Sequence, residues 1–150
     1  MLDTIRRHLA ALTSSSWTDF RATLAADAIY EEVPNRLRVV GAEQYVACIQ
    51  HWKAAFPDLK ATVTRGYTIG ERVIVEIEWE GTHSGSFEGV FGKLAPTHRR
   101  GRVNGVIVFT LKSGKIAETK HYFDLLTVLT QLGVSATAIT ASPAGGSPPL

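Results

Sequence analysis

Apolar residues recur at two different periods along this chain, first with helical spacing and later with the alternation of strands. In the segment 41–56, apolar side chains recur every three or four residues, which predicts one amphipathic helix. Its stripe consists of Ala42, Tyr45, Val46, Ile49, Trp52 and Phe56. Pro57 follows directly, and because proline cannot continue a helix we expect the helix to end there.

Two shorter helices are predicted before this one. The first covers residues 3–12. The second follows Ser14–Ser16 and carries Asp19 in its first turn, and both a serine N-cap and an early acid complement the exposed amides at a helix start. Residues 28–33 then favour a short strand that is closed by Pro34.

From residue 59 onward the period changes to two. In the segment 71–83 one parity is apolar and the other carries three glutamates, which predicts a strand with one solvated face. The residues predicted to face inward are Val73, Val75, Ile77, Trp79 and His83. The segment 101–124 is typical of a hairpin that turns at Ser113 and Gly114, followed by a short helix over 125–133.

The first arm of this hairpin is apolar on both parities, so both of its faces are expected to be covered. Either helices cover one face and a partner subunit the other, or the strand is central in the sheet. Together these elements predict an α+β fold, in which N-terminal helices pack on a curved antiparallel sheet. Residues 1–133 form this domain, and the Pro- and Gly-rich segment 134–150 is predicted to be a flexible or draped tail.

The composition narrows the function classes. Sixteen Lys and Arg against fourteen Asp and Glu give a net charge of +2, so we expect no nucleic-acid partner, and the basic cluster 97–102 is interpreted as solvated surface. Nothing approaches the roughly 18 apolar residues of a membrane helix. The start of the chain is a poor secretory signal and Cys48 has no second cysteine to pair with, which favours a cytoplasmic protein. The five histidines lack metal-ligand spacing.

Four segments taken together, 51–59, 71–89, 96–97 and 114–133, resemble the SnoaL-like polyketide cyclases of the nuclear-transport-factor-2-like superfamily. The resemblance covers roughly residues 15–133. Its most specific parts are the FPD after the long helix, the GTHSG, and the block that runs from GKI through YFD to QLG. It implies a cone of helices against a curved sheet around a deep apolar pocket, commonly in dimers. It also implies acid–base chemistry from a pocket aspartate without a cofactor.

Asp124 is the residue that matches the aspartate of this family. A carboxylate in an apolar cavity loses solvation of its charged form, so its pKa rises and it can act as a general base near neutral pH. The alternative is that Asp124 caps the last helix by accepting the amides of Leu126 or Thr127. The two roles can coexist.

Two helpers are predicted around Asp124. His83 shares strand parity with Trp79, so it is expected to face the cavity and to orient Asp124 or polarise a carbonyl, with a purely structural role as the alternative. Tyr122 shares parity with Asp124 and can donate its hydroxyl to that carboxylate or to a substrate oxygen.

Two neighbours of these residues are also placed by parity. His121 has the opposite parity to Asp124 and is not expected to pair with it unless a bulge intervenes. Lys120 shares the parity of Asp124, so it is either a rim residue or a second charge in the pocket.

Large aromatic side chains are the candidates for substrate contact, with an ordinary core role as the alternative for each. They are Trp52, Phe56, Trp79, Tyr30 and Tyr45. The sequence therefore favours an enzyme without cofactor or metal, which performs an aldol-type cyclisation or a related proton abstraction on a small hydrophobic carbonyl compound. An epoxide-hydrolase or isomerase reaction and a non-catalytic binding role remain alternatives. A homodimer through the outer sheet face is also expected.

Overall fold

The computed structural model describes residues 1–135 of the chain. Most of the predicted tail, residues 134–150, therefore lies outside the described residues. Across residues 1–135, no helix has the length and apolar character needed to cross a membrane.

Six strands form the main sheet, in the order β2-β1-β8-β7-β4-β3. Their bounds are β1 Leu24–Glu32, β2 Leu37–Val40, β3 Lys60–Ile69, β4 Arg72–Thr82, β7 Arg100–Lys112 and β8 Lys115–Phe123. A small hairpin of β5 Phe87–Gly89 and β6 Gly92–Leu94 stands apart from this sheet. The helices are α1 Leu2–Ser14, α2 Trp17–Ala22, α3 Ala42–Ala55 and α4 Leu125–Gln131.

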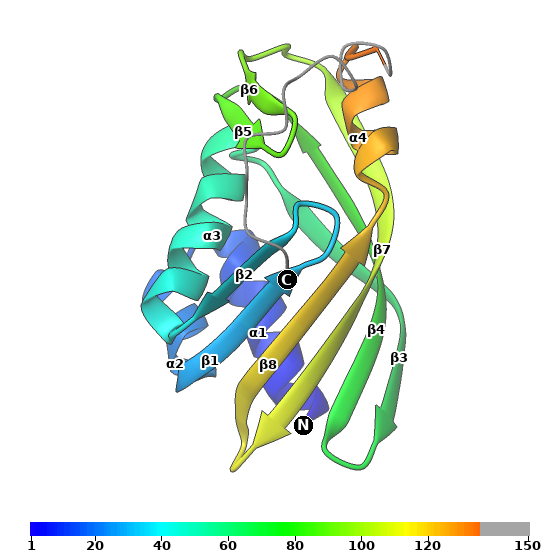
Figure 1. Cartoon of the computed structure of the whole chain (residues 1–150). Coiled ribbons are helices and arrows are strands. Elements are labelled where there is room, and N and C mark those ends of the chain that lie inside the picture. Colours follow the sequence, from blue (N-terminus) through cyan, green and yellow to red (C-terminus); the bar gives the residue numbers. More distant parts are fainter. Residues whose placement is uncertain (136–150) are drawn as a thin grey trace.

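The sheet is curved, and the three N-terminal helices lie on one side of it while α4 and the β5-β6 hairpin lie at one end (Figure 1). The α+β class predicted from the sequence is confirmed. The central strand β7 has β8 on one side and β4 on the other, as its apolar pattern allowed. The turn at Ser113 and Gly114 has φ values of 50° and 75°, the left-handed pair that a two-residue hairpin turn requires.

One strand pair departs from the predicted antiparallel sheet. β1 and β8 are parallel, with Tyr30 beside Thr119 and Glu32 beside His121. Because these strands are far apart in the chain, no short turn forces them to be antiparallel. This pairing brings the inward side chains of β1 next to those of β8.

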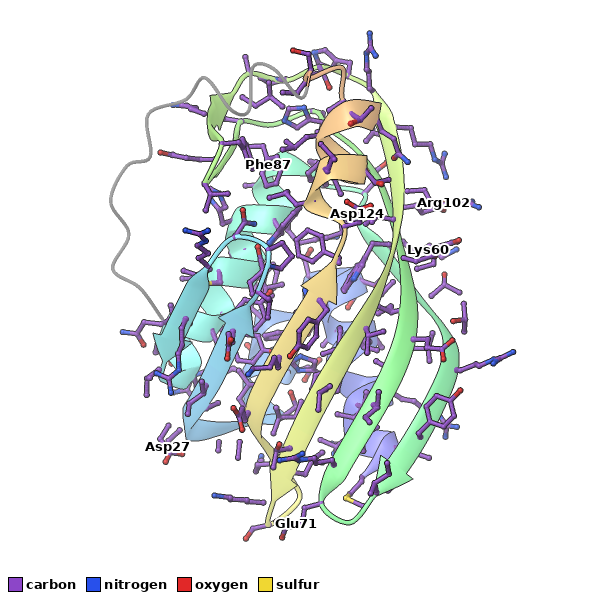
Figure 2. The ribbon with its side chains drawn as sticks, turned by 45° about the vertical axis from the view of Figure 1, so that its right-hand side comes forward. Asp27, Lys60, Glu71, Phe87, Arg102 and Asp124 are labelled. Atoms are coloured by element: carbon purple, nitrogen blue, oxygen red, sulfur yellow. The ribbon has the colours of Figure 1, made fainter. Side chains whose placement is uncertain are left out.

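Two groups of buried apolar residues hold the elements together. The main core lies between the helices and the sheet and includes Phe20, Tyr45 and Phe109. The upper cluster consists of Ala55, Phe56, Phe87, Val128, Leu129 and Leu132. It joins the end of α3 to α4 and to the β5-β6 hairpin, and Figure 2 shows Phe87 at this end of the molecule.

Candidate functional site

A cavity that is partly open to solvent lies between the sheet and the helices. Its walls come from α1, β1, α3, β4, β7, β8 and α4. The aromatic residues predicted for substrate contact all line it, namely Trp52, Phe56, Trp79, Tyr30 and Tyr45. Most of the wall is apolar, so the few polar groups that reach it define what the cavity can do chemically.

His121 is one of these polar groups, with 8% of its surface exposed. The indole Nε1–H of Trp79 donates a 3.1 Å hydrogen bond to Nε2 of His121. Burial lowers the pKa of His121 to about 3, so the ring is neutral at pH 7. Because Nε2 accepts from the indole, the ring proton resides on Nδ1, which is 3.5 Å from the hydroxyl of Tyr30.

Glu32 is a carboxylate behind the cavity wall, with only 1% of its surface exposed. It accepts a 2.7 Å hydrogen bond from the hydroxyl of Tyr30 and a 2.8 Å bond from the indole N–H of Trp52. The amide of Asn35 donates a third bond. Tyr30 and Trp52 both line the cavity, so Glu32 is connected to the cavity by its hydrogen bonds to these two side chains.

Burial is also the first cause of the raised pKa of Tyr30, and the charge of Glu32 adds to it. The Tyr30 hydroxyl therefore keeps its proton and directs it at Glu32. Within residues 1–135, no lysine, arginine or histidine forms an ion pair with Glu32. This carboxylate is held by neutral donors alone.

A second polar group lies on another part of the wall. The hydroxyl of Tyr45 is 2.9 Å from Oγ1 of Thr119 and 3.3 Å from Nε2 of His8. Nδ1 of His8 is in turn 2.7 Å from Oγ1 of Thr23. Burial lowers the pKa of His8 to about 3, so this histidine is neutral as well.

The prediction that Asp124 lies in the cavity with a raised pKa is wrong. Its side chain is exposed at the start of α4, where Figure 2 shows it at the junction with β8, and it is not among the cavity-lining residues. Its carboxylate accepts the backbone amide of Thr127 at 3.0 Å and the Thr127 hydroxyl at 2.6 Å. These bonds lower the pKa of Asp124. The alternative role, the helix cap, is the one that its contacts support.

The two predicted helpers also lie outside the cavity wall. Tyr122 is 42% exposed on the outer face, because it has the opposite parity to His121. His83 does face inward as its parity predicted, but it lies directly after the end of β4 and outside the cavity wall, where its ring packs on Phe56 and Phe87 of the upper cluster. Its Nδ1 binds Thr97, and burial lowers its pKa.

The remaining charged neighbour, Lys120, lies on the outer face. Its ammonium forms a 3.2 Å ion pair with Glu31, so it is not a second charge in the cavity. The residues that sequence reasoning missed are Glu32, His121, His8 and Thr119. One signal for Glu32 was available, since it shares strand parity with Tyr30 and is therefore an acid on the inward face of a short strand.

The adjacent ends of β4 and β7, together with α4, form one part of the cavity wall. Gly81 and Gly101 face each other across these two strands and leave the wall there without side chains. The side-chain amide of Gln131 fixes α4 to this place: it accepts the Arg102 backbone amide at 2.6 Å and donates to the Arg102 carbonyl at 2.8 Å. Arg100 and Arg102 both bind the Glu80 carboxylate at 3.0 Å, and Arg102 also lies 3.7 Å from Glu78, so two arginines are paired with two glutamates here.

Comparison with known proteins agrees with this architecture. The family model for SnoaL-like polyketide cyclases matches residues 2–132 of the chain. No curated protein matches the chain.

Three solved structures illustrate the likeness. A putative SnoaL-like polyketide cyclase from Jannaschia sp. CCS1 is 27% identical with a TM-score of 0.76, over 95% of this chain and 92% of that one. IdmH, a putative polyketide cyclase from Streptomyces antibioticus, is 28% identical with a TM-score of 0.73, over 88% and 97%. A protein with a ketosteroid isomerase-like fold from Catenulispora acidiphila, in complex with trimethylamine, is 20% identical with a TM-score of 0.76, over 93% and 97%.

Proposed function

Because the chain belongs to the SnoaL-like polyketide cyclase family, we propose that its cavity binds a small, uncharged and mainly apolar carbonyl compound and catalyses a proton transfer without a cofactor. The finer proposal is an aldol-type cyclisation or a related enolisation. Two aspects of the cavity support it. The wall is mainly apolar, and its buried histidines are neutral. An uncharged ligand can therefore enter the cavity with only a small net loss of solvation.

The observation that carries this proposal is the buried carboxylate of Glu32. An ionised carboxylate that is removed from water without a cationic partner costs free energy, so folding alone gives no reason to retain one. Its three hydrogen-bond donors reduce that cost, and two of them belong to the cavity wall. A base in this position can accept a proton from a bound molecule through a side chain that touches both.

In the proposed step, Nδ1–H of His121 donates a hydrogen bond to the substrate carbonyl oxygen. The 3.5 Å separation from Tyr30 is longer than an ordinary hydrogen bond, so this proton is available to a ligand. The carbon–hydrogen bond next to the carbonyl breaks and its proton passes to the Tyr30 oxygen, while the Tyr30 hydroxyl proton passes to Glu32. The enolate is stabilised by the neutral His121, in the way that a fixed donor stabilises developing charge. In a cyclisation, the enolate carbon then attacks a second carbonyl of the same molecule, whose C=O π bond opens to an alkoxide, and this alkoxide takes the proton back from Glu32 through the Tyr30 hydroxyl.

A non-catalytic binding role is the second candidate. It is favoured by the hydrogen bonds that already engage the polar hydrogens of Tyr30, Trp52 and Trp79 within the wall. An epoxide-hydrolase reaction has less support, because the charged residues that border the cavity, Glu80 and Arg102, are already paired with each other.

Deuterium incorporation from solvent separates the enzyme from the binder. The protein is incubated in D₂O with a panel of enolisable ketones, including 1-tetralone, and the mass of each ketone is followed. The proposal expects exchange above the buffer rate for at least one ketone and its loss in Tyr30→Phe, with binding retained in a fluorescence titration of the cavity tryptophans. Binding without exchange across the panel would favour the binder.

A homodimer through the outer sheet face is also proposed. Tyr67, Val106 and Tyr122 are 45%, 37% and 42% exposed there, and Val106 lies beside Tyr122 in the sheet register. Apolar side chains gathered on one sheet face favour association with a second copy. Sedimentation equilibrium is expected to give a dimer that dissociates in Val106→Glu, and a monomeric wild-type protein would contradict this. The half-buried, unpaired Cys48 further supports a cytoplasmic setting.

A further inference from the structure

The polar group at Tyr45 and Thr119 is a chain of side-chain hydrogen bonds that begins at α2 and ends at the cavity wall. Oγ1 of Thr23 donates its proton to the carbonyl of Phe20 at 2.6 Å. Its bond with Nδ1 of His8 must therefore run from the ring to the hydroxyl, so the proton of this ring lies on Nδ1. Nε2 of His8 is left as a hydrogen-bond acceptor, and the hydroxyl of Tyr45 is 3.3 Å away from it.

The hydroxyl of Tyr45 has one proton and two acceptors within reach, Nε2 of His8 and Oγ1 of Thr119. If Tyr45 donates to Thr119, the buried Nε2 of His8 has no donor, and leaving a buried acceptor unpaired is costly. If Tyr45 donates to His8, the Thr119 hydroxyl can donate to the Tyr45 oxygen, and every buried group has a partner. This second arrangement satisfies more groups with the same atoms.

In that arrangement the series of hydrogen bonds ends on the lone pairs of the Thr119 hydroxyl oxygen. Thr119 is only 1% exposed and lines the cavity, and Tyr45 is its only side-chain hydrogen-bond partner within residues 1–135. Its proton is used toward Tyr45, so its oxygen can only accept from a molecule in the cavity. The end of this chain therefore selects a ligand group that donates a hydrogen bond.

We propose that Thr119, aligned by Tyr45 and His8, forms a subsite that accepts a hydrogen bond from a hydroxyl group of the ligand. The side chains of Thr119 and His121 project inward from the same strand, two residues apart, which places them about 7 Å apart. His121 offers a hydrogen-bond donor to the ligand, whereas Thr119 offers a hydrogen-bond acceptor. The donor role of His121 rests on the proposed function. Taken together, the two groups predict that the ligand is a hydroxy-ketone with its hydroxyl and carbonyl oxygens at opposite ends.

Three probes that share one bicyclic ketone skeleton test the subsite: 6-hydroxy-1-tetralone, 6-methoxy-1-tetralone and 1-tetralone. Their affinities are measured on the full chain by titration of the fluorescence of Trp52 and Trp79, which line the cavity. A neutral hydrogen bond contributes about 1 kcal/mol, so the hydroxyl compound is expected to bind about fivefold more tightly than the other two. In Thr119→Val this preference is expected to disappear.

Thr119→Ser is the matched control, because it keeps the hydroxyl and is expected to keep the preference. Equal affinities of the hydroxyl and methoxy compounds for the wild-type protein would overturn the subsite, and so would a preference that persists in Thr119→Val. Neither result depends on catalysis. Loss of the proposed function would instead appear as ketone binding without deuterium exchange, with the hydroxyl preference intact.

Discussion

The indole N–H of Trp79 on β4 donates to Nε2 of His121 on β8, across the intervening strand β7. This one bond fixes which nitrogen of the buried imidazole carries the proton and points that N–H toward Tyr30. The proton of Tyr30 points in turn at Glu32. The indole of Trp79 therefore sets the direction of this series of hydrogen bonds, although Trp79 makes no other hydrogen bond within the series.

Trp79→Phe is expected to destabilise the protein, since it leaves Nε2 of His121 buried without a donor. The cost of such an unpaired group is about 1 to 3 kcal/mol in the free energy of unfolding. Urea unfolding measures it, with Trp17→Phe as the matched control, because the indole of Trp17 packs on Phe20 and, within residues 1–135, donates no hydrogen bond to a histidine. A Trp79 variant as stable as the Trp17 variant would contradict the assigned bond.

Stability should fall with acid below pH 6.5. His8 and His121 have pKa values of about 3 in the folded protein against 6.5 in the unfolded chain, so between these values only the unfolded chain binds their protons. The free energy of unfolding then decreases by about 1.4 kcal/mol per pH unit for each histidine as the pH falls. His83, whose pKa burial also lowers, acts in the same direction.

The test window for this effect is pH 5 to 6.5. It lies above the titration of Asp58, Glu80 and Asp124, whose pKa values are lowered and whose contributions are lost at more acidic pH. Urea unfolding at several pH values gives the slope, and His121→Gln is expected to reduce it by about 1 kcal/mol per pH unit, because the unfolded histidine is only half protonated at the upper end of this window. A stability that does not change across this window would contradict the buried, neutral state of both rings.

Asp124→Ala is expected to lower the free energy of unfolding by about 1 kcal/mol, because it removes the N-cap of α4. Asp124→Asn should cost less, since asparagine is an equally good N-cap. Chemical unfolding of the two variants side by side gives both values. Equal losses in both would argue against the cap and for a role of the charge itself.

Gly85→Ala should be strongly destabilising, by about 3 kcal/mol. A Cβ at this position would lie 1.9 Å from the carbonyl oxygen of Ala54, at the end of α3, where the amide of Gly85 binds the Ala55 carbonyl. Ser84→Ala is the matched control, since its side chain is exposed and its backbone bond is kept. Thermal unfolding compares them, and similar melting temperatures would show that the end of α3 can move away.

Periodicity was sufficient for the four helices, for the long strands and for the aromatic wall of the cavity, but not for β2 or the β5-β6 hairpin. The stripe of α3 and the inward parity of β4 bring Trp52, Phe56 and Trp79 to one side, and no long-range information is needed for that. The predicted placement of Asp124 was wrong, because its side chain lies outside the cavity at the end of β8. A carboxylate at a strand–helix junction can point into the cavity or back to the helix amides, and three-dimensional packing decides between them.

Glu32 and His121 were missed for a different reason. Each is an ordinary polar residue in its own strand, and only the parallel pairing of β1 with β8 places them side by side. Pairings between distant strands leave no local trace in a single sequence. Strand parity nevertheless places His121 and Asp124 on opposite faces, in agreement with the structure.

The most direct test of the account compares Glu32→Gln with Asp124→Asn in the deuterium-exchange assay, using the ketone that the wild-type protein exchanges fastest. Both changes remove one negative charge and keep the shape of the side chain. Removal of a general base commonly costs 10²- to 10⁴-fold in rate. We predict a loss of at least about 100-fold in Glu32→Gln and a rate within about threefold of wild type in Asp124→Asn. Loss of exchange in Asp124→Asn with full activity in Glu32→Gln would contradict the account.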